Sequence, residues 1–421
     1  MEKQPETFSQ SSAVARFSTG FRQMFCGKSD ISFASGITTV FALTVILFIF
    51  GWLFDPSETQ SYLFFAKCQD FLADFFNPII YVNDCNPYFA IDRTCADRIS
   101  TPPHYLLFYL FHLLIGSPLK LHEMYIDKNA LAVAVLNLVF SEIFLFFMLE
   151  KISAGKNKVL LCLLIFSGVN MSAIERGTLV IFTAGCIAGF LHYYQSSERK
   201  TQIFALILLS LAAALKVYPA LFGLMLLKKR DLKGILFCIV LTSALGILPM
   251  FCFKGGLANL QQLFSNLETY RVFYKTSPGA QALSNIIGLF TYPVKPGPAV
   301  DWWRKVVDFL AIGTLICSFF NGRKEKLFFA AAAVIILCPV GAAPYTLLYL
   351  LPAFLLFVNR TQQGHSKTDV LTAAGYILLF MPFQLSENIN KTFVLTVLPL
   401  MLLIQLSEET VELRHKLFKT K

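Results

Sequence analysis

The stretch LLSLAAALKVYPALFGLMLL, residues 208–227, decides the fold, because it is apolar almost throughout and yet contains Lys216 and, three residues later, Pro219. Such a run is typical of a membrane-spanning segment. An ammonium inside a span costs roughly 3 kcal/mol or more, so the lysine is expected to serve a purpose. A proline there frees backbone groups that lipid cannot satisfy. The stretch therefore predicts a membrane helix that is broken near Lys216.

The rest of the chain has the same character. Of its 421 residues 56% are hydrophobic and 15% are charged, and the mean hydropathy is +0.60. Apolar runs recur from end to end, which predicts an all-α polytopic membrane protein. The first run, about 31–54, lacks a small-residue cleavage site and is predicted to be a retained span and not a removed signal peptide.

The apolar runs predict about 10–13 transmembrane helices in a single membrane domain, residues 1–421. We expect 202–215 and 217–227 to be half-length helices that meet near Lys216, as in membrane proteins that build a site at a helix break. The predicted spans and half-spans are 33–54, 129–149, 158–173, 177–194, 202–215, 217–227, 234–253, 304–320, 326–342, 343–358, 370–384 and 392–407.

Basic residues between the runs predict the orientation. With the N-terminus inside, the short cytoplasmic segments hold 22 of the 36 Lys and Arg residues, as the positive-inside rule requires. Both termini are then cytoplasmic (1–32 and 408–421), and two longer loops, 55–128 and 254–303, are extracytoplasmic. This threading predicts a multi-pass protein of a bacterial inner (plasma) membrane.

The segment PPHYLLFYLFHLLIG, residues 102–116, is apolar but short. If it crossed the membrane, the basic cluster that follows residue 150 would fall outside. We therefore expect an interfacial or re-entrant helix that belongs to the first outer loop. In the same loop, Cys85 and Cys95 either form a disulfide or remain free thiols.

Candidate chemistry lies in polar residues that stand among apolar ones on the outer side. The segment CQDFLADFFNPIIYVNDCNPYF, 68–89, places Asp70 and Asp74 beside aromatic residues. A carboxylate in such surroundings can serve as a general base. The alternative is that these aspartates solvate the loop or cap helices.

Three further places are candidates for substrate contacts. Glu175 and Arg176, in NMSAIERGTLVIF (170–182), precede a helix N-terminus that favours an anion, or they form a pair that caps a turn. Lys216, beside Tyr218, suits a phosphate at the membrane boundary, or it extends to the interface. Tyr345, in CPVGAAPYTLLYLLP (338–352), follows a break in the chain that is otherwise a simple turn. The intramembrane carboxylates Glu142 and Asp308 are alternative partners of Lys216.

Several function classes lack support. The sequence contains no nucleotide-phosphate or hydrolase motif and no metal-like spacing of Cys and His. The basic clusters serve as topology signals, so no nucleic-acid partner is expected. We expect no cofactor and no required metal. An enzyme of this kind needs an activated substrate that is already in the bilayer, and a lipid-linked phosphate meets that need.

The motifs also carry a family resemblance. They occur in the order DFLADFFN, NPYF, PPHYLL, ERGT, LAAALKVYPALFGLMLLKKRDLKG, QALSNIIGLF and PVGAAPYTLLYLLP, over roughly 50–355. With them the chain resembles the GT-C-type membrane glycosyltransferases, most closely glycosyltransferase family 87. The Lys216 stretch is the most specific of these motifs, whereas ERGT departs from the asparagine-bearing turn usual in the family.

This resemblance implies sugar transfer from a polyprenyl-phosphate-linked donor to a lipid or glycan acceptor on the extracytoplasmic face, with inversion. It implies a catalytic aspartate before an aromatic residue in the first outer loop, a place that Asp74 fits best and Asp70 almost as well. The family's lysine corresponds to Lys216. Many members are mannosyltransferases, but the sugar stays open here.

We therefore expect a glycosyltransferase with Asp74 as general base and Asp70 as the alternate. Lys216 and Arg176 are expected to bind the phosphate. Glu175, Tyr218, His104 and Tyr345 are expected to line the substrate site. The main rival is a secondary transporter or lipid-linked glycan flippase, which would also use a broken helix. A polysaccharide polymerase or ligase is a third hypothesis, although its outer loops would be rich in arginine.

Overall fold

The computed structural model describes residues 33–54, 71–83, 85–89, 98–116, 120–276, 298–321, 323–338, 344–361, 366–382 and 387–419. Within these ranges every regular element is a helix and none is a strand. The elements are, in chain order, α2 (Phe33–Phe54), α4 (Ala73–Tyr81), α5 (Pro102–Ile115), α6 (Leu121–Met124), α7 (Lys128–Ser153), α8 (Lys158–Leu164), α9 (Gly168–Arg176), α10 (Val180–Tyr193), α11 (Arg199–Leu215), η3 (Tyr218–Gly223), α12 (Leu224–Lys229), α13 (Leu232–Ile247), η4 (Leu248–Cys252), α14 (Ala258–Thr276), α15 (Pro298–Asn321), α16 (Lys324–Leu337), η7 (Pro344–Leu350), α17 (Leu351–Thr361), α18 (Lys367–Phe380) and α19 (Glu387–Lys419).

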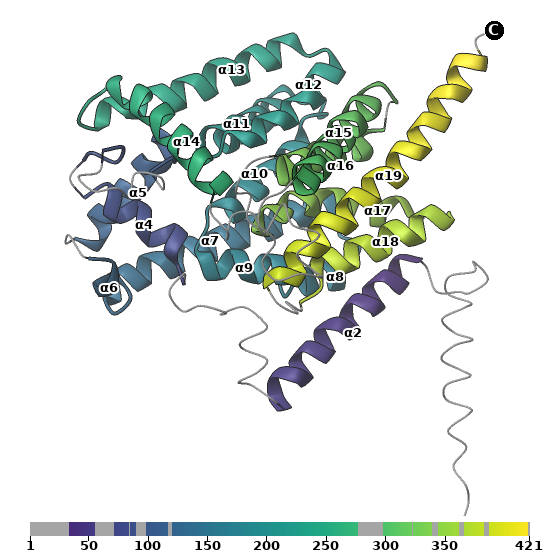
Figure 1. Cartoon of the computed structure of the whole chain (residues 1–421), viewed down its shortest axis with the longest axis horizontal. Coiled ribbons are helices and arrows are strands. Elements are labelled where there is room, and N and C mark those ends of the chain that lie inside the picture. Colours follow the sequence, from purple (N-terminus) through teal and green to yellow (C-terminus); the bar gives the residue numbers. More distant parts are fainter. Residues whose placement is uncertain are drawn as a thin grey trace, which may run out of the picture.

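The helices form one bundle whose two ends differ (Figure 1). Helices α7, α10, α11 and α13 pack against one another in succession, and α15 packs against both α16 and α19. The short helices α4, α5 and α6 gather at one end of the bundle, at the left of Figure 1, whereas the C-terminal end of α19 projects at the upper right. The candidate site lies at the end that carries α4 and α5.

The membrane character of the fold is confirmed. Among the described residues, three helical segments are long and apolar enough to cross a bilayer, Phe33–Gly51, Lys128–Ser153 and Leu232–Cys252, and the bent pair α8–α9 counts as a fourth if it forms one span. Shorter apolar helices include α5 and α10. The chain is therefore an all-α polytopic membrane protein. The predicted total of about 10–13 crossings stays a prediction.

Small residues let the central helices approach closely. A Cβ added to Gly185 of α10 would lie 2.7 Å from the ring of Phe144 in α7, and one added to Gly189 would lie 2.6 Å from Leu208 in α11. Because lipid tails are as apolar as leucine, helices in a membrane are held mainly by such close packing. The two glycines thus fix α10 between α7 and α11.

Two segments that the sequence predicts to lie outside the spans are helical in the structure. The segment 254–303, predicted to be the second outer loop, contains the 19-residue helix α14, in which polar and apolar residues alternate too closely to form an apolar run. Its buried Asn266 donates hydrogen bonds to the carbonyls of Tyr88 and Arg98 and so joins it to the first loop. The predicted tail, 408–421, continues helix α19 to Lys419 without a break.

The orientation can be tested by cysteine labelling in a variant that lacks the ten native cysteines. Ile126, 79% exposed between α6 and α7, belongs to the predicted outer side, and the exposed Arg230 belongs to the cytoplasmic side. We expect an impermeant maleimide to label Ile126→Cys in intact cells and Arg230→Cys only after permeabilisation. The reverse pattern would place the candidate site on the cytoplasmic face.

Candidate active site

Asp74 is held at the start of α4, beside the end of α9. Leu72 adopts a left-handed conformation just before α4, and its amide donates a 2.7 Å hydrogen bond to the carbonyl of Glu175. The next residues of α4, Phe75 and Phe76, are fully buried in an apolar cluster with α5 and α7. Burial of these rings orients α4 so that Asp74 remains on its partly exposed side.

Arg176 forms an ion pair with Asp74. Its Nε and its terminal nitrogen donate to Oδ1 of Asp74 at 3.1 and 2.6 Å. The two side chains are 30% and 21% exposed, so the pair lies at a boundary and not in free solvent. Gly177 ends α9 with φ +66°, a conformation that glycine adopts without strain and that turns the chain from α9 into α10.

Tyr345 completes the set of contacts on Asp74. This residue lies in η7, and its hydroxyl donates a 2.7 Å hydrogen bond to the second carboxylate oxygen, Oδ2. Both oxygens of Asp74 are thus engaged by side chains from two other elements. The carboxylate is held in one orientation while part of its surface remains open.

Lys216 stands at the predicted helix break. Helix α11 ends at Leu215, and Lys216 has an extended backbone before the 3-10 turn η3. In a continuous helix the carbonyl of Leu215 would accept from the amide of residue 219, but Pro219 has no N–H. The hydroxyl of Thr101 supplies the missing donor at 3.0 Å and so joins the start of α5 to this break.

The ammonium of Lys216 has no protein partner among the described residues. Lys216 is half-buried, and its charge acts on the Asp74 carboxylate and on His104. Within the same part of the chain its side chain forms no ion pair and no hydrogen bond, either with Glu142 or with Asp308. Lys216 is therefore a partly accessible cation beside a fixed carboxylate.

The other predicted lining residues lie around this group in different ways. His104 is 3% exposed and stacks on Phe108 with ring centroids 4.7 Å apart, and neither ring nitrogen has a hydrogen-bond partner among the described residues. Tyr218 meets the ring of Tyr349 edge-on at 5.7 Å. Glu175 contributes its backbone carbonyl to the Leu72 contact. Asp70 and Cys95 lie outside the described residues, so the alternate base and the disulfide stay predictions.

Sequence reasoning missed two residues of this region. The hydroxyls of Tyr349 and Thr183 are buried and share a 2.6 Å hydrogen bond that joins η7 to α10. Because Tyr349 also contacts Tyr218, this bond supports the turn that follows Lys216. The four-residue spacing between Tyr345 and Tyr349, about one helical turn, is the signal that could have identified Tyr349.

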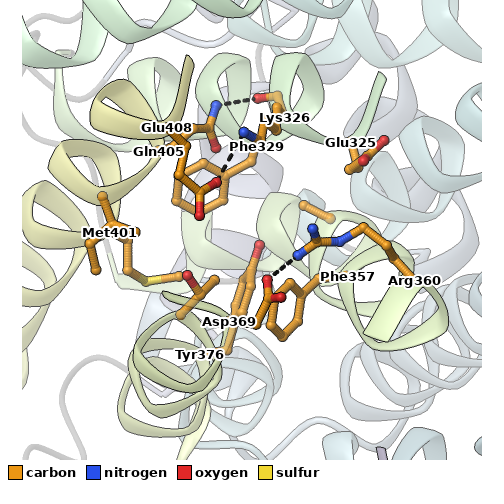
Figure 2. A pocket seen from close by; sticks show the side chains of 13 residues that line it. Glu325, Lys326, Phe329, Phe357, Arg360, Asp369, Tyr376, Met401, Gln405 and Glu408 are labelled. Atoms are coloured by element: carbon orange, nitrogen blue, oxygen red, sulfur yellow. Dashed lines mark hydrogen bonds and ion pairs between the residues drawn. The ribbon is translucent and has the colours of Figure 1, made fainter. Parts of the chain in front are cut away.

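A second polar region lies among α16, α17, α18 and α19, the helices whose facing ends are predicted to be cytoplasmic (Figure 2). A second, more open cavity of about 700 Å³ shares Arg360, Asp369 and Glu408 with the pocket drawn in Figure 2, and its lining also includes Arg323 and Glu412. Arg323 pairs with Glu412 at 2.9 Å, and Arg360 pairs with Asp369.

The cationic side chains of this region are in ion pairs with carboxylates, although Nε of Arg360 has no hydrogen-bond partner among the described residues. Lys326 pairs with Glu408 at 3.0 Å, so each of the three cations that line the region already has a carboxylate. Burial would raise the pKa of the Asp369 carboxyl, but the Ser366 backbone amide and the Arg360 guanidinium outweigh burial and hold this pKa below its usual value. Asp74, Arg176 and Lys216 do not line the cavity. It is a structural ion-pair network and a weaker candidate for chemistry.

Comparison with known proteins assigns the chain to a family. A family model described as glycosyltransferase family 87 matches residues 101–348, more than half of the chain. The chain belongs to glycosyltransferase family 87. This glycosyltransferase is a membrane protein, and its substrates are a sugar donor and an acceptor. No curated protein and no solved structure matches it.

The matched residues contain most of the site. Arg176, Lys216 and Tyr345 lie within them, whereas Asp74 precedes them. Among the described residues, no group of three His, Cys, Asp or Glu side chains is placed to hold a metal ion. Arg176 and Lys216 are the cationic side chains near Asp74 in the described part of this family 87 glycosyltransferase.

Gly177→Ala should disturb this site through the backbone. A Cβ at Gly177 would lie 2.9 Å from Cβ of Phe75, and φ +66° is strained for alanine. We expect a loss of about 1–3 kcal/mol of stability, measured as a lower thermal midpoint. Gly223→Ala is the matched control, because an added Cβ there meets nothing within 4 Å. Equal midpoints for the two variants would contradict this account of the turn.

Proposed function

We propose that this family 87 enzyme transfers a sugar from a polyprenyl-phosphate-linked donor to a lipid or glycan acceptor on the extracytoplasmic face, with inversion at the anomeric carbon. Asp74 acts as the general base. We further propose a GT-C-type architecture and a hexosyl donor, with mannose as one candidate sugar. One observation carries the proposal: Lys216, an ammonium without a partner in the described part of the chain, acts electrostatically on a carboxylate that three hydrogen bonds hold in place.

The reaction needs Asp74 to accept a proton and Lys216 to stabilise the negative charge that develops on the phosphate. The oxygen of the acceptor hydroxyl attacks the anomeric carbon and forms the new glycosidic bond. The bond between this carbon and the phosphate oxygen breaks, and its electron pair remains on the phosphate. The hydroxyl proton passes to Asp74. Attack from the face opposite the leaving phosphate inverts the anomeric centre.

Asp74 can accept this proton although it is paired. A carboxylate offers about four lone-pair positions, of which Arg176 and Tyr345 use three. Arg176 and Tyr345 hold the carboxylate in one orientation. A carboxylate suffices as the base where the proton is transferred late, after the leaving group has begun to depart.

Lys216 is proposed to hold the departing phosphate. A compact ammonium suits a phosphate oxygen, whose negative charge grows as the bond to the sugar breaks. Two hydrogen bonds from Arg176 position Asp74, and the guanidinium keeps further N–H donors for the phosphate. We therefore keep Arg176 as a second phosphate binder, and Tyr218 and His104 as candidate lining residues beside Lys216.

The rival hypothesis of a flippase can be separated by one assay. Purified protein is mixed in detergent with polyprenyl-phosphate sugars and with a lipid extract that contains acceptors. A transferase releases polyprenyl phosphate and adds one sugar mass to a product. A flippase changes only the leaflet of its substrate, so in detergent it produces no new compound. Unchanged mass spectra with every donor tested would contradict the proposal.

Asp74→Asn tests the general base. Asparagine keeps the size of the side chain but cannot accept a proton, so we expect transfer to fall about 10²–10⁴-fold with normal membrane insertion. Asp127→Asn is the matched control in the same loop, because Asp127 caps α7 and asparagine is an equally good N-cap. Normal turnover in Asp74→Asn, together with its loss in Asp70→Asn, would move the role to Asp70.

Lys216→Met tests the phosphate site. Methionine keeps the length and removes the charge, so we expect a higher KM for the donor with equal or greater thermal stability. Lys216→Arg should restore binding only in part, because a planar guanidinium does not replace a compact ammonium. Lys254→Met, at an exposed lysine that is also predicted to be outside, is the control. A loss of stability with normal donor binding would make Lys216 a structural residue.

A further inference from the structure

Glu142 lies at the middle of the membrane-spanning helix α7 (Lys128–Ser153). Its side chain contacts that of Asn170, in the first turn of α9. The structure shows no ion pair between Glu142 and any described residue. A carboxylate at the centre of a span is rare and usually marks a functional site, with a partner that compensates its charge.

The polar atoms around Glu142 are short of donors. Oε1 of Glu142, Oγ of its neighbour Ser141 and Oδ1 of Asn170 are buried and have no hydrogen-bond partner among the described residues. Ser141 is 1% exposed and Asn170 is 2% exposed. All three atoms are oxygens that accept hydrogen bonds or bind cations. Buried polar atoms without partners call for a guest of the complementary kind.

The backbone beside Asn170 also presents oxygen. Helices α8 and α9 meet at a break with a bend of 46°, and Nδ2 of Asn170 donates a 3.2 Å hydrogen bond to the carbonyl of Ile165 in this break. The backbone amide of Asn170 donates a 3.3 Å hydrogen bond to Oγ of Ser167, and its side-chain Oδ1 has no hydrogen-bond partner among the described residues. Broken membrane helices bind small cations through such mixtures of carbonyl and side-chain oxygens.

We propose that Glu142, Ser141 and Asn170 form a binding site for one monovalent cation, with Na⁺ as the ion of matching chemistry. The site offers oxygen ligands only, and one formal negative charge balances one positive charge. The ion would join the middle of α7 to the start of α9. Because α9 ends at Arg176, the ion also fixes the helix that positions Asp74.

The pocket of Figure 2 contains carboxylates whose charges are balanced by cationic side chains of the same chain. There Asp369 forms an ion pair with Arg360, and Glu408 forms one with Lys326. Glu142 has no such cation among the described residues, and Lys216 does not supply one. The difference between the two sites is the reason to place an ion at Glu142.

Thermal unfolding of the purified full chain without substrate tests the site, and its outcome does not depend on the proposed transferase activity. Unfolding is followed in sodium chloride and in N-methyl-D-glucamine chloride at equal ionic strength, because the bulky organic cation serves as the cation that does not bind. Binding to the folded state raises the thermal midpoint, so we expect sodium to raise it by about 2 °C or more once its concentration exceeds the dissociation constant several-fold.

Two variants assign the effect to this site. Glu142→Gln removes the charge and should abolish the sodium response, whereas Glu150→Gln, two turns later on the same helix, should retain it. If Glu142→Gln does not fold, Ser141→Ala serves instead and should shift the response to higher sodium. Equal midpoints for the unchanged protein in the two salts would overturn the proposal, because they would show that Na⁺ does not bind to the folded state. An unaltered sodium response in a folded Glu142→Gln variant, or in the substitute Ser141→Ala, would overturn it as well.

Discussion

The ion pair between Asp74 and Arg176 determines the arrangement of the bundle end that carries α4 and α5, because it joins two segments separated by 102 positions in the chain. A partly exposed pair contributes only about 0–1 kcal/mol by itself, so it cannot supply the energy that holds α4 in place. That energy comes from burial of Phe75 and Phe76, each worth roughly 1.5–3 kcal/mol. The pair instead selects one orientation, which the backbone bond between Leu72 and Glu175 reinforces.

The bilayer imposes a second constraint, since a helix that breaks within it must find new partners for its backbone. At the Lys216 break, the hydroxyl of Thr101 takes the place of the amide that Pro219 lacks. At the break between α8 and α9, Ser167 caps the new helix through the amide of Asn170. The helix ends that result point polar groups into the bundle, which is why both the candidate active site and the proposed ion site lie at breaks.

Hydropathy reports only whether a segment prefers lipid or water, and its successes and failures follow from that. It predicted the all-helical membrane fold and, with Pro219, the break at Lys216, because both depend on local composition. It placed Asp74, Arg176 and Tyr345 on one face but could not show that Arg176 binds Asp74, since that contact depends on packing between distant helices. It missed α14, because the mixture of polar and apolar side chains in this helix gives no strong preference for lipid or for water. The choice between Asp70 and Asp74 stays open, as Asp70 is outside the described residues.

The last constraint on the fold comes from Lys216 and Glu142. Neither side chain has an ionic partner in the described part of the chain. Burial of either charge raises the free energy of the folded state, and an ion pair between them would offset part of this cost. The fold nevertheless keeps them in separate surroundings, with Lys216 acting on Asp74 and Glu142 in contact with Asn170. A chain that needed only stability could have replaced both with apolar residues of similar size. Their separation is best explained if each charge has a guest of its own, an anion at Lys216 and a cation at Glu142.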